Sequence, residues 1–144
     1  MTRRYMLDTD TCVFVMRGPS ENLRVKLLTT PIEQQAISVV TLAELVFGIK
    51  VSSQAKLNRA ALDAFVKHLT VLEWPEAAAE HYGEIRAHLQ KRGQMIGAND
   101  LFNAAHARSI GAVVVTNNER EFRRVPGLKV ENWLATRPNL NDYR

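Results

Sequence analysis

Short apolar runs alternate with stretches of helical periodicity along most of the chain. The apolar runs predict five strands, at Tyr5–Leu7, Ala36–Val39, Val71–Trp74, Ala112–Thr116 and Lys129–Trp133. The fourth run is the clearest, because an uninterrupted stretch of β-branched residues is typical of a strand that is buried on both faces. The last run is predicted as either an edge strand or an extended segment.

Helices are predicted between these strands from apolar residues spaced three and four apart. The first runs through Cys12–Met16 after cap residues at 9–11, and Gly18 and Pro19 end it. The others are predicted from Ser20 to about Leu28, from Thr41 along the face Leu42, Leu45, Val46 and Ile49, along Leu57, Ala61, Phe65 and Leu69, from Pro75 to about Lys91, from Asn99 or Asp100 to near Gly111, and briefly after Asn118.

Strands separated by helices imply an α/β fold, with a parallel sheet covered by helices on both faces. Ligands bind such sheets beyond the carboxyl ends of the strands. Asp8 follows the first predicted strand, and Thr116, Asn117 and Asn118 end the fourth. The site is therefore expected at the edge where these residues meet. With 144 residues and no repeat or linker, we expect one domain over residues 1–135 and a tail over 136–144.

Composition narrows the class of protein. A hydrophobic content of 46% and a charged content of 24% are ordinary for a soluble domain. The single cysteine, Cys12, excludes an internal disulfide and a cysteine-based zinc site. No apolar stretch approaches a membrane span, and the short apolar run near the start argues against a signal peptide, so we expect a cytoplasmic protein. The net charge of +4 permits an anionic partner such as nucleic acid.

Three acids stand where apolar elements begin or end: Asp8, Glu44 and Asp100. Hard oxygen ligands without cysteine or paired histidine suit Mg²⁺ or Mn²⁺ better than zinc. Such ions can generate hydroxide and neutralise the charge of a phosphodiester under attack. The histidines, by contrast, lack the spacing of metal ligands and are expected at the core edge or surface; they are His68, His81, His88 and His106.

Each acid also has a purely structural explanation. Asp8 can be a turn residue at a strand end, and Asp100 can cap a helix or favour its dipole. Glu44 completes the pattern Thr41-x-x-Glu44, a capping box, although it points roughly 150° away from the apolar stripe of its helix. Asn118-x-x-Glu121 is likewise a plausible capping pair. The sequence pattern alone leaves these alternatives open.

Basic residues are numerous enough to form a phosphate-binding rim, although some must be ordinary solvated positions. The candidates are Arg3, Arg4, Arg17, Lys50, Arg86, Lys91, Arg92, Arg108, Arg120, Arg123 and Arg124.

Taken in order, several motifs resemble the PIN-domain ribonuclease toxins called VapC. They are Met6–Asp10, Val40–Gly48, Ile85–Arg86, Gly93–Asp100, Ala104–Ala107, Val115–Phe122 and Gly127–Trp133, which together cover essentially the whole chain. The resemblance implies a three-layer α/β/α PIN domain, with a short twisted parallel sheet flanked by helices. It also implies a toxin of a type II toxin–antitoxin module that inhibits translation by Mg²⁺- or Mn²⁺-dependent cleavage of structured RNA, in loops of transfer RNA or ribosomal RNA.

The resemblance assigns roles to particular residues. Asp8 and Asp100 match the principal metal ligands, and Glu44 would complete the site through the metal or its water. Thr116, Asn118 and Glu121 are further candidate catalytic residues. Many PIN domains have a fourth acid where this chain has Asn117 and Asn118, so Glu121 is the candidate substitute and a second metal stays open. Asp10 stands where the family often has asparagine.

The resemblance also implies partners. We expect a homodimer, a VapB-like antitoxin whose C-terminal Arg or Lys enters the acidic cleft, and a higher hetero-oligomer with that antitoxin. The apolar helical faces around Leu57 and Phe65 and around Leu42 and Ile49 mildly support dimerisation. Two alternative functions use the same scaffold: a metal-dependent DNA nuclease or phosphatase, and a non-catalytic RNA-binding module.

Overall fold

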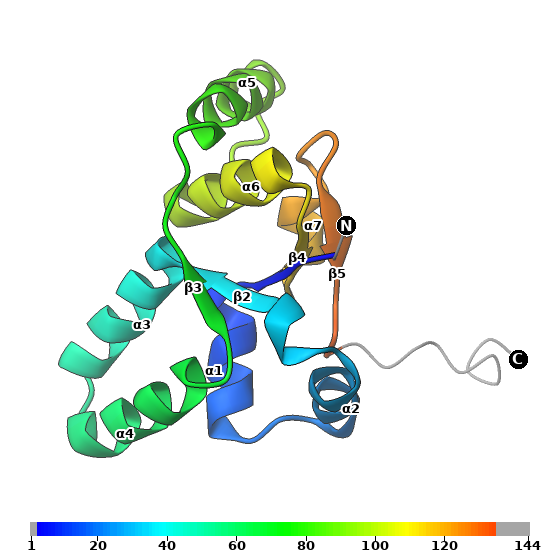
Figure 1. Cartoon of the computed structure of the whole chain (residues 1–144). Helices are drawn as coiled ribbons and strands as arrows, with labels where there is room; N and C mark the ends of the chain where they lie inside the picture. The colour runs from blue at the N-terminus through cyan, green and yellow to red at the C-terminus, as the bar shows by residue number, and fades with distance from the viewer. Residues whose placement is uncertain (1–2, 135–144) are drawn as a thin grey trace, which may run out of the picture.

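The computed structural model describes residues 3–134; the expected tail over 136–144 lies outside the described residues. Within this range, five strands form one sheet in the order β3-β2-β1-β4-β5, and every neighbouring pair is parallel (Figure 1). The strands are β1 (Tyr5–Leu7), β2 (Gln35–Ser38), β3 (Thr70–Leu72), β4 (Val113–Val115) and β5 (Lys129–Glu131). The predicted parallel α/β sheet is confirmed.

Helices cover both faces of this sheet, as Figure 1 shows. They are α1 (Thr9–Arg17), α2 (Glu21–Thr29), α3 (Val39–Lys50), α4 (Ala55–Val66), α5 (Ala78–Lys91), α6 (Ala98–Ile110) and the short α7 (Glu119–Phe122), with a 3₁₀ turn η1 (Ile32–Gln34) before β2. No helix in the described part of the chain is long and apolar enough to cross a membrane.

Two hydrophobic clusters show how the three layers form. Alternate residues of a strand point to opposite faces. Met6 and Val114 pack with α5, α6 and α7, whereas Leu7 and Val115 pack with α1 to α4. The central strands β1 and β4 are therefore buried on both sides, which explains the uninterrupted apolar run at β4. The three-layer α/β/α arrangement is confirmed.

Several predicted boundaries shift by a few residues. Val39 belongs to α3 rather than to β2, and Leu69 lies beyond the end of α4. Pro75 precedes a turn instead of opening α5. The predicted end of α6 is confirmed, since Gly111 caps that helix with φ of 67°, a left-handed conformation that favours glycine. All these differences fall at helix or strand ends, and none changes the topology.

Candidate active site

Asp8 lies at the carboxyl end of the central strand β1 and is only 5% exposed. Its Oδ1 accepts a hydrogen bond from the backbone N–H of Thr11 at 2.9 Å, so Asp8 is the N-cap of α1. The prediction that caps lie at 9–11 was wrong: the strand ends at Leu7 as predicted, but the acid directly after it, Asp8, serves as the cap. The Asp8 Oδ2 accepts from the Thr116 hydroxyl at 2.5 Å. Burial raises the pKa of Asp8, and these two hydrogen bonds oppose that shift.

Glu44 is not part of a capping box. The N-cap of α3 is Ser38, whose Oγ accepts from the Thr41 N–H at 3.0 Å, so Thr41 lies inside the helix. The capping explanation of Glu44 was therefore wrong. Instead, the Thr9 hydroxyl donates to Glu44 Oε1 at 2.8 Å. This bond holds the Glu44 carboxylate beside the first turn of α1, which Asp8 caps.

Asp100 is the third residue of α6, whose N-cap is Gly97 with no side-chain cap. Asp100 therefore lies in the first turn but is not the cap itself. Burial raises the pKa of Asp100 to about 7, and the nearby charges of Glu121, Asp8 and Glu44 contribute to that rise. A carboxyl that senses three other acids in this way lies at the centre of the acidic cluster, which we define as Asp8, Glu44, Asp100 and Glu121.

Glu121 comes from α7 and reaches the start of α6. Its Oε1 accepts from the Gly97 N–H at 2.7 Å, and its Oε2 accepts from the side-chain amide of Asn118. The Asn118 side chain makes no capping bond to α7, so the predicted capping pair was wrong. A Cβ on Gly97 would lie 3.3 Å from Asp100 Oδ2 and 3.8 Å from Glu121 Oε1. Glycine at this position lets the two acids approach each other closely.

Thr116 connects the two sides of the cluster. It is fully buried at the end of β4, donates to Asp8 and accepts from the backbone N–H of Asn118 at 2.8 Å. Thr116 thereby ties β1 to the segment that leads into Glu121. Asn117 points elsewhere, since its Oδ1 accepts from Asn132 at 3.3 Å. Asp10 is exposed and adds only the smallest contribution to the raised pKa of Asp8.

Sequence reasoning missed a buried polar contact behind the cluster. The Ser38 hydroxyl donates to Asn103 Oδ1, and the Asn103 amide donates to Thr41 Oγ1 at 3.1 Å. All three residues are at most 4% exposed. The contact joins the start of α3 to the middle of α6, and so sets Glu44 relative to Asp100. The available signal was a polar Asn103 within the small-residue stripe of its helix.

The donor set suits a hard divalent cation. All four members of the cluster offer carboxylate oxygens, and their mutual repulsion is what a cation relieves. Across residues 3–134, no three acidic, histidine or cysteine side chains are positioned to hold one ion together. A cleft of about 750 Å³ adjoins the cluster. Its lining includes Thr9, Glu44, Asn99 and the aromatic rings of Phe47, Trp74 and Phe102.

The aromatic side of this cleft is built by α5, α6 and the segment between β3 and α5. Phe102 stacks on Tyr82 with ring centroids 4.8 Å apart. The Trp74 indole packs edge-on against Phe102, and its N–H donates to the Phe102 carbonyl at 2.9 Å. These contacts give the cleft that Glu44 also lines an apolar aromatic wall.

Comparisons with known proteins agree with this architecture. The PIN domain family model matches residues 5–128. The chain is 42% identical over 131 residues to the "tRNA(fMet)-specific endonuclease VapC" of Salmonella typhimurium, covering 90% of this chain and 98% of that protein. It is 41% identical over 132 residues to "Ribonuclease VapC2" of Haemophilus influenzae, covering 91% and 98%.

Solved structures give the same result. A DNA-bound VapBC from Salmonella typhimurium superposes with a TM-score of 0.86 at 40% identity, covering 92% of this chain and 99% of that one. VapBC2 from Rickettsia felis, bound to a fragment of its promoter, gives 0.80 at 38% identity, covering 90% and 98%.

Proposed function

Because this chain belongs to the PIN domain family, and within it to the VapC group, we propose that it is the toxin of a type II toxin–antitoxin module and acts as an endoribonuclease. The observation that carries the proposal is the acidic cluster at the carboxyl ends of β1 and β4, where the pKa of Asp100 rises to about 7. Acids whose mutual repulsion and burial raise a carboxyl pKa in this way are typical of a functional site. The non-catalytic alternative lacks support, because a purely binding module has no need of this repulsion.

We propose that the cluster binds Mg²⁺ or Mn²⁺. Asp8 and Asp100 would be the direct ligands, and Glu44 would act through the metal or a bound water. Mg²⁺ is commonly held by one or two carboxylates and keeps several waters, which agrees with the lack of three convergent side chains in the described residues. When bound, such an ion supplies charge neutralisation for the phosphodiester and a more acidic water.

The residues of the chain itself prepare this site. Thr116 and the Thr11 N–H each donate to one oxygen of Asp8, which fixes the plane of its carboxylate. Thr9 does the same for Glu44. The Gly97 N–H and Asn118 hold Glu121 next to Asp100. Because the pKa of Asp100 is about 7, cation binding at neutral pH releases its proton where one is held.

Transfer RNA is the substrate we propose to test first. A relative at 42% identity is named for cleavage of tRNA(fMet), and the +4 net charge favours an anionic partner. The aromatic wall of Trp74 and Phe102 beside Glu44 offers a surface on which an unpaired base can stack. A loop with splayed bases suits this cleft better than a duplex.

We propose a VapB-like antitoxin as the partner, since two neighbouring structures are VapBC complexes. Its C-terminal Arg or Lys would enter the acidic cluster, because a guanidinium or ammonium offsets the same repulsion that a metal does. We also propose that the protein is a homodimer in the cytoplasm, and that this dimer forms a larger assembly with the antitoxin. Of the faces predicted for dimerisation, only Leu57 is largely exposed, because Leu42, Ile49 and Phe65 pack in the core. Leu57 on α4 and Phe47 on α3, exposed at 66% each, support such contacts.

The decisive experiment is a cleavage assay with purified, antitoxin-free protein. Transfer RNA, ribosomal RNA and DNA are incubated with the protein in EDTA, in Mg²⁺ and in Mn²⁺. We expect transfer RNA to be cut at a single loop with either metal and not in EDTA. Cleavage of DNA at a comparable rate would favour the DNA nuclease alternative, and full activity in EDTA would exclude the metal mechanism.

A further inference from the structure

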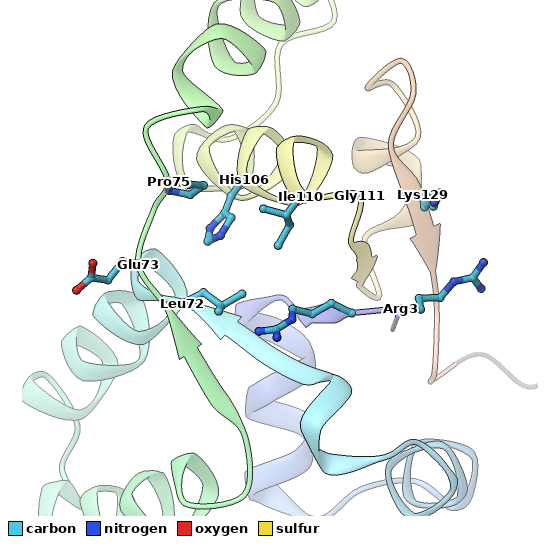
Figure 2. A pocket seen from close by; sticks show the side chains of 9 residues that line it. Arg3, Leu72, Glu73, Pro75, His106, Ile110, Gly111 and Lys129 are labelled. Atoms are coloured by element: carbon cyan, nitrogen blue, oxygen red, sulfur yellow. The ribbon is translucent and has the colours of Figure 1, made fainter. Parts of the chain in front are cut away.

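A second concavity lies on the α6 side of the sheet, away from the acidic cluster (Figure 2). It has a volume of about 710 Å³, and none of the four clustered acids lines it. Its walls come from the residues before β1, the segment after β3, the last turns of α6 and the start of β5. Asp100 and Ile110 stand at opposite ends of α6, about 15 Å apart along its axis. The pocket is therefore a separate site.

Positive charge predominates around this pocket. Arg3, Arg4 and Lys129 line it, against the single acid Glu73. Within residues 3–134, none of these three cations forms an ion pair or a side-chain hydrogen bond. Four other arginines of the described residues do form ion pairs with acids, as Arg108 does with Glu84. Three unpaired cations around one hollow favour an anionic ligand.

The pocket also contains a buried polar group without a partner. His106 is 1% exposed, and its Nδ1 has no hydrogen bond in the described part of the chain. Figure 2 shows the ring projecting from α6 toward Leu72, beside Ile110. Buried polar atoms are nearly always hydrogen-bonded, so an orphan at the base of a pocket indicates a missing partner. Burial also lowers the pKa of His106, so the ring is neutral at pH 7 and Nδ1 can donate a single hydrogen bond to a polar ligand atom or accept one from it.

Apolar side chains complete the pocket. Leu72, Pro75 and Ile110 also line it, and in Figure 2 they surround the ring of His106. Inorganic phosphate would use the cations alone and leave these surfaces and the histidine without contacts. A ligand that satisfies all three features carries a phosphate, a flat apolar body and a neutral hydrogen-bonding edge. The volume lies within the range of small-ligand sites.

We propose that this pocket binds a nucleotide, with its phosphate at Arg3, Arg4 and Lys129 and its base between the apolar side chains and His106. A free nucleotide and one nucleotide of a longer RNA offer the same chemistry. If the nucleotide belongs to an RNA, which rests on the proposed ribonuclease function, the pocket is a second contact for the substrate, one helix length from the acidic cluster. If the nucleotide is free, the pocket is an effector site.

In the test, ligands are titrated into the full-length, antitoxin-free protein in EDTA, and binding is monitored by NMR of the histidine ring signals. His106→Gln identifies the His106 signal among the four histidines. The probes are the four nucleoside 5′-monophosphates and, separately, inorganic phosphate. We expect at least one nucleotide to shift the His106 signal saturably, at a concentration at least tenfold lower than phosphate requires. No shift up to millimolar nucleotide, or an equal response to phosphate, overturns the proposal.

Charge variants give the matched comparison. Arg4→Gln combined with Lys129→Gln should weaken nucleotide binding at least tenfold, whereas Lys56→Gln on the exposed face of α4 should leave it unchanged. Equal binding by all of these proteins would contradict the proposal. Competition by a short RNA assigns the site to bound RNA, and failure to compete assigns it to a free nucleotide; either result supports the nucleotide chemistry. Because no metal or cleavage is involved, a failure of the proposed ribonuclease function would leave this result intact and distinguishable.

Discussion

Replacing Asp100 with asparagine should stabilise the metal-free protein, even though we expect it to abolish activity. The pKa of Asp100 rises from 3.8 to about 7, chiefly through burial and the charge of Glu121. The folded state therefore binds the proton more tightly than the unfolded state does between these two values. By linkage, the free energy of unfolding of the wild type falls as pH rises from about 4 to about 7. An asparagine side chain carries no charge at any of these pH values, so the variant would avoid this loss.

The size of the effect follows from the shift. About three pKa units correspond to about 4 kcal/mol, at about 1.36 kcal/mol per unit. Asp100 keeps partial contact with solvent, and screening reduces the usable figure to about 1–2 kcal/mol. Asparagine also tolerates the first turn of a helix, so the substitution itself should cost little. The expected gain is therefore near zero at pH 4 and about 1–2 kcal/mol at pH 8.

The assay is urea unfolding in EDTA at both pH values, with circular dichroism as the signal. Asp63→Asn is the control, since Asp63 is an exposed acid that pairs with Arg59 on α4 and makes no contribution to the raised pKa of Asp100. That variant should show no gain that grows with pH. If Asp100→Asn is no more stable than the wild type at pH 8, the four acids do not repel one another as described. In a separate series without EDTA, Mg²⁺ should raise the urea midpoint of the wild type more than that of Asp100→Asn, because only the wild type keeps both proposed ligands.

Four further outcomes are expected. Glu44→Gln should retain the circular dichroism spectrum and lose most RNA cleavage, since Glu44 caps nothing; near-normal activity would make it dispensable. Ser38→Ala should lower the free energy of unfolding by about 1–2 kcal/mol in urea, because it removes the α3 cap and a buried partner of Asn103; an unchanged midpoint would contradict this. Light scattering at micromolar concentration should give a dimer, and a monomer would refute it. Crosslinking with the co-expressed antitoxin should place its C-terminal Arg or Lys beside Asp8 and Asp100, and a distant inhibitory contact with metal still bound would reject that model.

The sequence predicted the layers of the fold well because the relevant signals are local. The uninterrupted apolar run at Val113–Val115 predicts a strand that is buried on both faces. The apolar spacing of α5 predicts a helix that is buried on one face only. Helix starts were predicted less well. Ser38 and Thr41 are both good cap residues three positions apart, and the local sequence does not choose between them. Pairing of β2 with its neighbours ends the strand at Ser38, and this non-local fact decides the cap.

The acidic cluster likewise combines features that the local sequence indicates with contacts that only the folded chain reveals. Asp8, Glu44 and Asp100 stand out in the sequence because each was expected near the start or end of an apolar element, although Glu44 lies in the middle of α3. The contact of Thr116 with Asp8 joins residues 108 positions apart, and no local pattern indicates it. Glu121 was suggested only by family resemblance, because its approach to Asp100 depends on how α7 folds back against Gly97. Asn103 went unnoticed because its partners are on another helix. The catalytic roles of these residues stay predictions.

The central position of β1 has a consequence for protein synthesis. Asp8 emerges early, but its strand partner β4 and its hydrogen-bond donor Thr116 are made about 110 residues later. At a translation rate of about 5–20 residues per second, the nascent chain spends roughly 6 to 20 s without a complete cluster. A ribosome making this chain therefore carries a product whose acidic cluster is incomplete until Thr116 and Glu121 are released. Under the proposed ribonuclease function, that interval would keep the nascent protein inactive although α1 and α3 are already made.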